Sequence, residues 1–290
     1  MTLFSYDFMV RALIGAMITG VSAPAIGTYL VQRRLALIGD GIGHVALTGV
    51  GVGLLLHRSP VLTAVIVSAL GAVAIELIRE RGKSSGDIAL ALLFYGGISG
   101  GVFLVSLSSD STNANLNSYL FGSVLTTSRA DLIVIAILGA AVLLVALGVR
   151  PWLFAVSHDE EFARVSGLPV RALNLTLAIV TAVTVTVAMR AVGLLLVSAL
   201  MIVPVAAAQL ITRSFRSTMA LAMVFGLICS IVGLTASWEM NTPPGASAVL
   251  VAILGFVVIA IGVSGWRRRL RARLAAGEVA EPPDVVLEAS

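Results

Sequence analysis

Two ionisable side chains, Asp40 and His44, lie within an otherwise apolar stretch of the chain, residues 35–56. On a helix, their i, i+4 spacing places them on one face with Cβ atoms about 5–6 Å apart. A charged carboxylate at the centre of a bilayer costs at least about 2.5 kcal/mol, so this pair is expected to meet a partner, water or an ion. Imidazole nitrogen and carboxylate oxygen together suit divalent ions such as Zn²⁺, Mn²⁺ or Fe²⁺. We therefore predict that both side chains face a pore and touch a divalent metal ion.

One aspartate and one histidine do not complete a tetrahedral metal site. Two copies of the chain around a two-fold axis would supply two of each, so the pattern predicts a homodimer or an ion that keeps waters. Incomplete ligation suits transport, in which binding must be weak enough to allow release. We expect a transported ion rather than a permanent cofactor. Zinc comes first because histidine plus carboxylate suits it well, with manganese or iron as alternatives.

Glycines surround the pair, and Gly39 and Gly43 have the GxxxG spacing that lets another helix approach closely. An alternative interpretation is that these glycines serve packing alone and that Asp40 caps a helix beginning at Gly41. That alternative leaves the depth of His44 in the apolar stretch unexplained.

The composition indicates which elements must position these residues. Of the 290 residues, 58% are hydrophobic and 12% are charged, whereas soluble domains carry about 25% charged residues. Backbone groups in lipid need internal partners, and the apolar runs lack strict alternation, so we predict an all-α polytopic membrane protein. About nine transmembrane helices are expected, with eight or ten as alternatives. The predicted spans are residues 8–31, 35–56, 61–78, 88–107, 132–149, 173–189, 192–211, 219–238 and 246–265.

The distribution of basic residues predicts the orientation of these spans. With the C-terminus in the cytoplasm, fifteen of the nineteen Lys and Arg residues fall in inside segments. The net charge of +4 therefore reflects topology rather than nucleic-acid binding. His44 would lie about 13 Å along a helix that starts at Leu35, near mid-membrane. We expect one transmembrane domain over residues 1–266. The tail over residues 267–290, basic and then acidic, is expected to be disordered and to contact membrane lipid.

A charged inside segment, residues 157–169, predicts a short helix below the membrane. Ser157 and Glu160 have the spacing of a capping box, and Gly167 is placed to end the helix. It could be a connector lying on the membrane surface, but such a helix should carry a basic polar face. We favour a contact with a protein partner. The residues predicted to make it are Ser157, Asp159, Glu160, Glu161, Phe162, Ala163 and Gly167.

Three further residues are candidates for the pathway or for packing. Asp87 begins the fourth span, where an acidic residue favours the helix dipole. Pro204 should kink its span and could shape the pore wall. Gln209 could hydrogen-bond to a neighbouring helix.

Several stretches resemble the permease subunits of metal-ion ABC importers, the zinc, manganese and iron (ABC-3) class. They are RRLALIGDGIGHVALTGVGVG, GDIALALLFYGG, YLFGSVL, EEFARVSG, AVGLLLVSALMIVPVAAAQL and NTPPGASAVL. The resemblance covers nearly the whole chain in order. It implies a type II-like importer permease that forms a homodimer with a central pathway in a bacterial plasma membrane. One departure is Thr48, where many relatives have proline.

The resemblance also assigns roles to the residues singled out above. It places Asp40 and His44 in the pathway and makes Ser157–Pro169 the coupling helix, which fits a cleft on a separate ATPase subunit. An extracytoplasmic metal-binding protein would deliver the ion. The chain has no G-x-x-x-x-G-K-[ST] pattern. We therefore expect no enzymatic activity of its own, with ATP bound and hydrolysed by the partner.

Two other classes of protein compete with this interpretation. A secondary carrier driven by an ion gradient could use the same Asp/His pair and would need no coupling helix. An intramembrane metalloenzyme is disfavoured because the chain lacks HExxH and has three histidines in total.

Overall fold

A computed structural model describes residues 7–81, 86–108, 120, 122 and 129–275. Every element assigned within these residues is an α-helix. The helices are α1 (Asp7–Gln32), α2 (Ile38–Leu55), α3 (Pro60–Arg81), α4 (Gly86–Leu107), α6 (Arg129–Gly148), α7 (Arg150–His158), α8 (Glu160–Val165), α9 (Val170–Val192), α10 (Leu194–Ile211), α11 (Phe215–Met240) and α12 (Pro244–Ala275).

The helix lengths confirm an all-α, multi-pass membrane protein. Eight of the described helices are long and apolar enough to cross a bilayer, and α10 contributes a shorter apolar helix over Leu196–Ile211. Each of the nine predicted spans corresponds to one of these helices, with its ends shifted by four residues or fewer except at the end of α12. The agreement follows from physics, because a bilayer requires about 20 consecutive apolar residues per helix.

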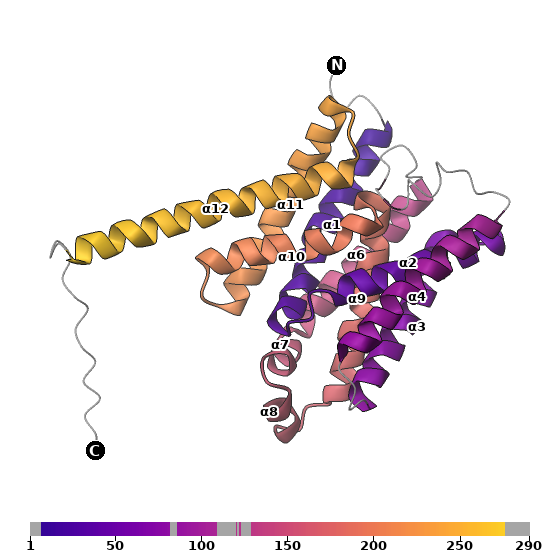
Figure 1. The fold of residues 1–290 in the computed structure, drawn as a ribbon, viewed down its shortest axis with the longest axis horizontal. Helices are drawn as coiled ribbons and strands as arrows, with labels where there is room; N and C mark the ends of the chain where they lie inside the picture. The colour runs from indigo at the N-terminus through magenta and orange to yellow at the C-terminus, as the bar shows by residue number, and fades with distance from the viewer. Residues whose placement is uncertain (1–6, 82–85, 109–119, 121, 123–128, 276–290) are drawn as a thin grey trace.

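The helices form two groups joined by a central set (Figure 1). One group is α2, α3 and α4, and the other is α10, α11 and α12. Between them, α1 packs against α6, α9, α10 and α11. More than half of each of α1, α2 and α9 is buried, whereas less than a quarter of α4, α6 and α12 is. Helix α2, which carries Asp40 and His44, is therefore an internal element.

The short helices α7 and α8 lie at one end of the bundle, which we call the α8 end. The end of α1, the start of α2, the ends of α3 and α6 and the starts of α9 and α11 meet there (Figure 1). Aromatic rings hold α7 in place: Phe154 packs on Phe215 at a centroid distance of 4.7 Å, and Tyr29 lies 5.1 Å from Phe215. The Tyr29 hydroxyl donates to the carbonyl of Ala146 at 2.6 Å, which ties α1 to α6.

The cap of α8 differs from the prediction. Ser157 lies in the last turn of α7, buried, with its hydroxyl unpartnered among the described residues. Asp159 occupies the N-cap position, and its carboxylate accepts a hydrogen bond from the Phe162 amide at 2.9 Å. The capping-box prediction for Ser157 is wrong because a helix begun at Arg150-Pro151 already includes Ser157. Gly167, at φ +80°, ends the segment as expected.

Helix α12 corrects a second boundary. Disorder was expected from residue 267, but the helix continues without a break to Ala275. Arginine and leucine are good helix formers, so the basic part of the tail extends the apolar helix. Figure 1 shows α12 reaching away from the other helices. Residues 276–290 lie outside the described part of the chain.

Candidate metal site and coupling region

Helix α2 starts later than the apolar pattern suggests, and this changes the depth of the Asp/His pair. The helix begins at Ile38, so Asp40 lies in its first turn and is half-buried. His44 lies about 9 Å from the helix start, at 1.5 Å per residue, rather than 13 Å. The N-cap position is Leu37, without a side-chain cap. Asp40 is therefore not the cap of a helix beginning at Gly41.

His44 is the most deeply placed ionisable side chain of this helix. It is 5% exposed, and its ring packs edge-on against Phe94 of α4 at a centroid distance of 4.1 Å. Its Nδ1 atom has no hydrogen-bond partner among the described residues. A buried polar atom left unpaired costs about 1–3 kcal/mol, so such an atom calls for an explanation, and a ligand or water is one.

The backbone of α4 packs directly against the backbone of α2 at the turn that contains His44. A Cβ added at Gly97 would lie 2.7 Å from the carbonyl carbon of His44, so only glycine allows this approach. One turn along α2, the Thr48 hydroxyl donates to the carbonyl of Gly97 at 2.7 Å. Thr48 therefore closes a contact between α2 and α4. Asp40, His44 and Thr48 thus form a polar stripe at i, i+4 and i+8.

Helix α10 borders the other side of the pair. A Cβ at Gly39 would lie 3.2 Å from the Ser198 hydroxyl, and one at Gly43 would lie 3.1 Å from the Leu194 side chain. The Ser198 hydroxyl is buried and, like His44, unpartnered among the described residues. The region around Asp40 therefore contains two orphaned polar atoms, on α2 and on α10.

Three other sequence candidates lie on α4 and α10. Asp87 is the second residue of α4, and its side chain lies outside the described residues. Pro204 is buried inside α10, and Gln209 is exposed near the end of that helix. In the part of the chain that is described, no three His, Cys, Asp or Glu side chains form a metal-holding group. Asp40 and His44 are thus a pair of potential ligands on one helix.

Helix α8 presents apolar side chains away from the bundle. Phe162 is 68% exposed and Val165 is 89% exposed, whereas Ala163 is buried against the protein. This six-residue helix therefore has one anchored face and two large exposed apolar side chains.

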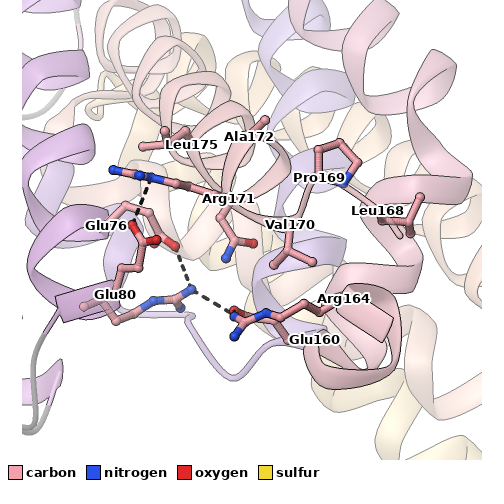
Figure 2. A pocket seen from close by; sticks show the side chains of 12 residues that line it. Glu76, Glu80, Glu160, Arg164, Leu168, Pro169, Val170, Arg171, Ala172 and Leu175 are labelled. Atoms are coloured by element: carbon pink, nitrogen blue, oxygen red, sulfur yellow. Dashed lines mark hydrogen bonds and ion pairs between the residues drawn. The ribbon is translucent and has the colours of Figure 1, made fainter. Parts of the chain in front are cut away.

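Beside α8 lies a groove that sequence reasoning missed, with a volume of about 940 Å³ (Figure 2). Figure 2 shows acidic and basic side chains alternating across it, from α3, α8 and α9. Arg171 pairs with Glu80 at 3.1 Å, and Arg79 pairs with Glu76 at 2.9 Å. In the sequence, the basic residues among them indicate only the orientation of the spans. Glu76, an acidic residue within the predicted span 61–78, is the one feature of the sequence that could have indicated the groove.

Comparison with known proteins places this geometry in context. A model described as the ABC 3 transport family matches residues 5–262. The manganese transport system membrane protein MntC of Halalkalibacterium halodurans is 34% identical over 251 residues, which are 86% of this chain and 85% of that protein. The chelated iron transport system membrane protein YfeD of Yersinia pestis is 32% identical, over 89% of this chain and 86% of that protein. Among solved structures, PsaBC from Streptococcus pneumoniae in complex with Fab has a TM-score of 0.81 at 29% identity, over 89% of this chain and 92% of that chain.

Proposed function

Since the chain belongs to the ABC 3 transport family, we propose that it is the membrane permease through which an ATP-driven importer passes a divalent transition metal ion. The observation that carries the proposal is the Asp40–His44 pair on the internal helix α2, with the Nδ1 atom of His44 buried and unpartnered among the described residues. A carboxylate and an imidazole one turn apart are ligands for such an ion.

The transported metal is proposed from both chemistry and relatives. MntC is named for manganese and YfeD for chelated iron, so we place manganese first and iron next. The donor set also accommodates zinc, which the residues alone favour. A homodimer would bring two Asp40–His44 pairs together around one ion, and the absence of a third ligand among the described residues supports this assembly.

The energy for transport would come from a separate ATPase. The exposed Phe162 and Val165 of α8 would dock in a cleft on that subunit, and the α8 end would face the cytoplasm. This orientation puts fifteen of the nineteen basic residues on the cytoplasmic side. The C-terminus would then also be cytoplasmic, and an extracytoplasmic binding protein would deliver the ion at the opposite face.

A secondary carrier is the competing function. It could use the same Asp/His pair to couple metal movement to protons, but it has no need of the exposed apolar side chains on α8. ATP dependence separates the two proposals.

The test measures radioactive manganese, iron and zinc uptake in cells that express the chain with its ATPase and binding protein. We expect uptake that requires a hydrolysis-competent ATPase and falls to background in Asp40→Asn and His44→Gln. The control is His57→Gln, which changes an exposed histidine at the opposite end of α2. Uptake that persists with an inactive ATPase would select the secondary carrier, and normal uptake in both pair variants would remove Asp40 and His44 from the pathway.

A further inference from the structure

Gln32 and Arg33, at the end of α1, contact His158 and Glu160, which flank the N-cap residue of α8. Gln32 Nε2 lies 3.3 Å from Nδ1 of His158, and Arg33 donates to Glu160 Oε2 at 3.0 Å. These contacts straddle Asp159, which caps α8. The start of α8 is therefore joined on both sides of its cap to the segment that leads into α2.

Glu160 is the centre of a group of ion pairs that joins three parts of the chain. Its carboxylate pairs with Arg33, and Arg79 of α3 lies 4.0 Å from the same oxygen. Arg79 in turn pairs with Glu76 at 2.9 Å. Arg164, one turn along α8, pairs with the other oxygen of Glu160 at 3.4 Å, but its side chain is exposed and lies on the same helix. We call Arg33, Glu76, Arg79 and Glu160 the Glu160 quartet.

Burial of Arg33 distinguishes the Arg33–Glu160 pair from a contact between two surface side chains. The Arg33 side chain is 7% exposed, and that of Glu160 is 39% exposed. Burial lowers the pKa of Arg33 from its ordinary value, and the nearby Arg79 adds to this shift. The carboxylate of Glu160 opposes the shift. Removing one partner of such a pair leaves a desolvated charge, so the two groups should move together.

The segment from Arg33 to α2 is short and held by backbone hydrogen bonds. It spans residues 33–37, and Arg34 holds a left-handed φ of 58°. Backbone bonds fold it back on α1, with the Leu35 amide donating to Leu30 at 2.8 Å, and forward onto α2, with Ile38 donating to Leu35 at 3.1 Å. Asp40 follows in the first turn of α2. A displacement of α8 carried by Glu160 would therefore reach Asp40 through a short, hydrogen-bonded segment.

We propose that the Glu160 quartet is the link by which α8 positions α2, so that movement of the coupling helix resets the Asp40–His44 pair. Arg33 and Glu160 are then positioning residues for transport, although neither touches the ion. This inference rests on the proposed function, because it takes α8 as the element that docks on the ATPase.

The experiment uses the full permease–ATPase complex in proteoliposomes, with the binding protein supplied at the face opposite the ATPase, and measures ATP hydrolysis and manganese uptake in the same preparation. The variants are Arg33→Gln, Glu160→Gln and the double variant. Glu80→Gln is the matched control, because it removes a carboxylate paired with arginine at 3.1 Å in the same groove but outside the quartet. Co-purification of the ATPase reports assembly.

We expect both single variants to assemble and hydrolyse ATP while manganese uptake per ATP falls at least about fivefold, the lower range of coupling between sites. The double variant should be no worse than either single variant, because both remove one link. Glu80→Gln should keep the ratio of wild type.

An unchanged uptake-to-ATP ratio in the single variants, or an equal loss in Glu80→Gln, would overturn the inference. So would failure of Arg33→Gln and Glu160→Gln to assemble, since the pair would then hold the fold rather than transmit movement. A wild-type complex without ATP-driven uptake would instead contradict the proposed function.

Discussion

At the scale of single residues, the important groups are polar atoms placed in an apolar helix bundle. Each such atom needs a hydrogen-bond partner in the protein or a ligand that binds and leaves, because lipid and apolar side chains offer no hydrogen bonds. Thr48 and His44 show the two cases. The Thr48 hydroxyl is satisfied by the carbonyl of Gly97, whereas Nδ1 of His44 is unpartnered among the described residues. The satisfied group stabilises the fold, and the unsatisfied one is available to a ligand.

Thr48→Val should therefore act on stability rather than on transport. The variant keeps the shape of the side chain and removes the hydrogen bond to Gly97, which for contacts between membrane helices is worth about 0.6 kcal/mol on average. We expect a small drop in the thermal unfolding midpoint of the purified protein in detergent. Thr176→Val is the control, because its hydroxyl bonds within its own helix, to Ala172. Equal midpoints in the two variants would show that the contact between α2 and α4 contributes nothing.

At the scale of elements, the sequence predicts where helices are but not where they begin. The apolar run from Leu35 is continuous with α2, yet the helix starts at Ile38 because the preceding residues fold back on α1. Leu37 carries no capping side chain, so no local signal marks this boundary. The same limit explains why the sequence does not identify the N-cap of α8. Ser157 and Asp159 are both of a type favoured at the N-cap, and only the extent of α7 decides between them.

Asp159→Ala should loosen α8, and Ser157→Ala should not. Loss of an N-cap costs about 1 kcal/mol, and the Phe162 amide would lose its 2.9 Å bond to the Asp159 carboxylate. Hydrogen exchange measured on a peptide covering residues 160–166 should become faster in Asp159→Ala alone. Faster exchange in Ser157→Ala instead would restore the capping box that the sequence suggests.

Gly97→Ala tests the packing of α4 on α2. The added Cβ would meet the backbone of His44 at 2.7 Å, and overpacking of this kind costs about 1–3 kcal/mol. The neighbouring Gly96 has nothing within 4 Å of its would-be Cβ. We expect a lower unfolding midpoint and reduced metal uptake in Gly97→Ala and wild-type behaviour in Gly96→Ala. A tolerated alanine at position 97 would contradict the close approach.

At the scale of the whole molecule, the apolar spans and the distribution of basic residues were readable from the sequence, because bilayer thickness and the membrane charge rule act on composition. The neighbours of each helix were not readable. Nothing local indicates that Arg33 and Glu160, 127 positions apart, form a pair. The candidate site divides in the same way: the sequence singles out Asp40 and His44, whereas Phe94, Ser198 and the Glu160 quartet appear only when the helices are packed.

The orientation of the molecule makes a direct prediction. Cys229 is the single cysteine and is buried, so an introduced thiol can be labelled against a low background. In intact cells, a membrane-impermeant maleimide should label Ser59→Cys, in the turn between α2 and α3, and should not label Val165→Cys on α8. Val165→Cys should react once the membrane is opened. The reverse pattern would place α8 outside and exclude its docking on a cytoplasmic ATPase.

Binding of the transported ion by His44 and Asp40 can be tested by electron spin echo spectroscopy of the Mn²⁺-loaded protein. A histidine nitrogen bound to Mn²⁺ modulates the echo. We predict this ¹⁴N modulation in wild type and in His57→Gln, its loss in His44→Gln, and weakened Mn²⁺ binding in Asp40→Asn. Modulation that survives in His44→Gln would show that another histidine holds the metal and would contradict the account.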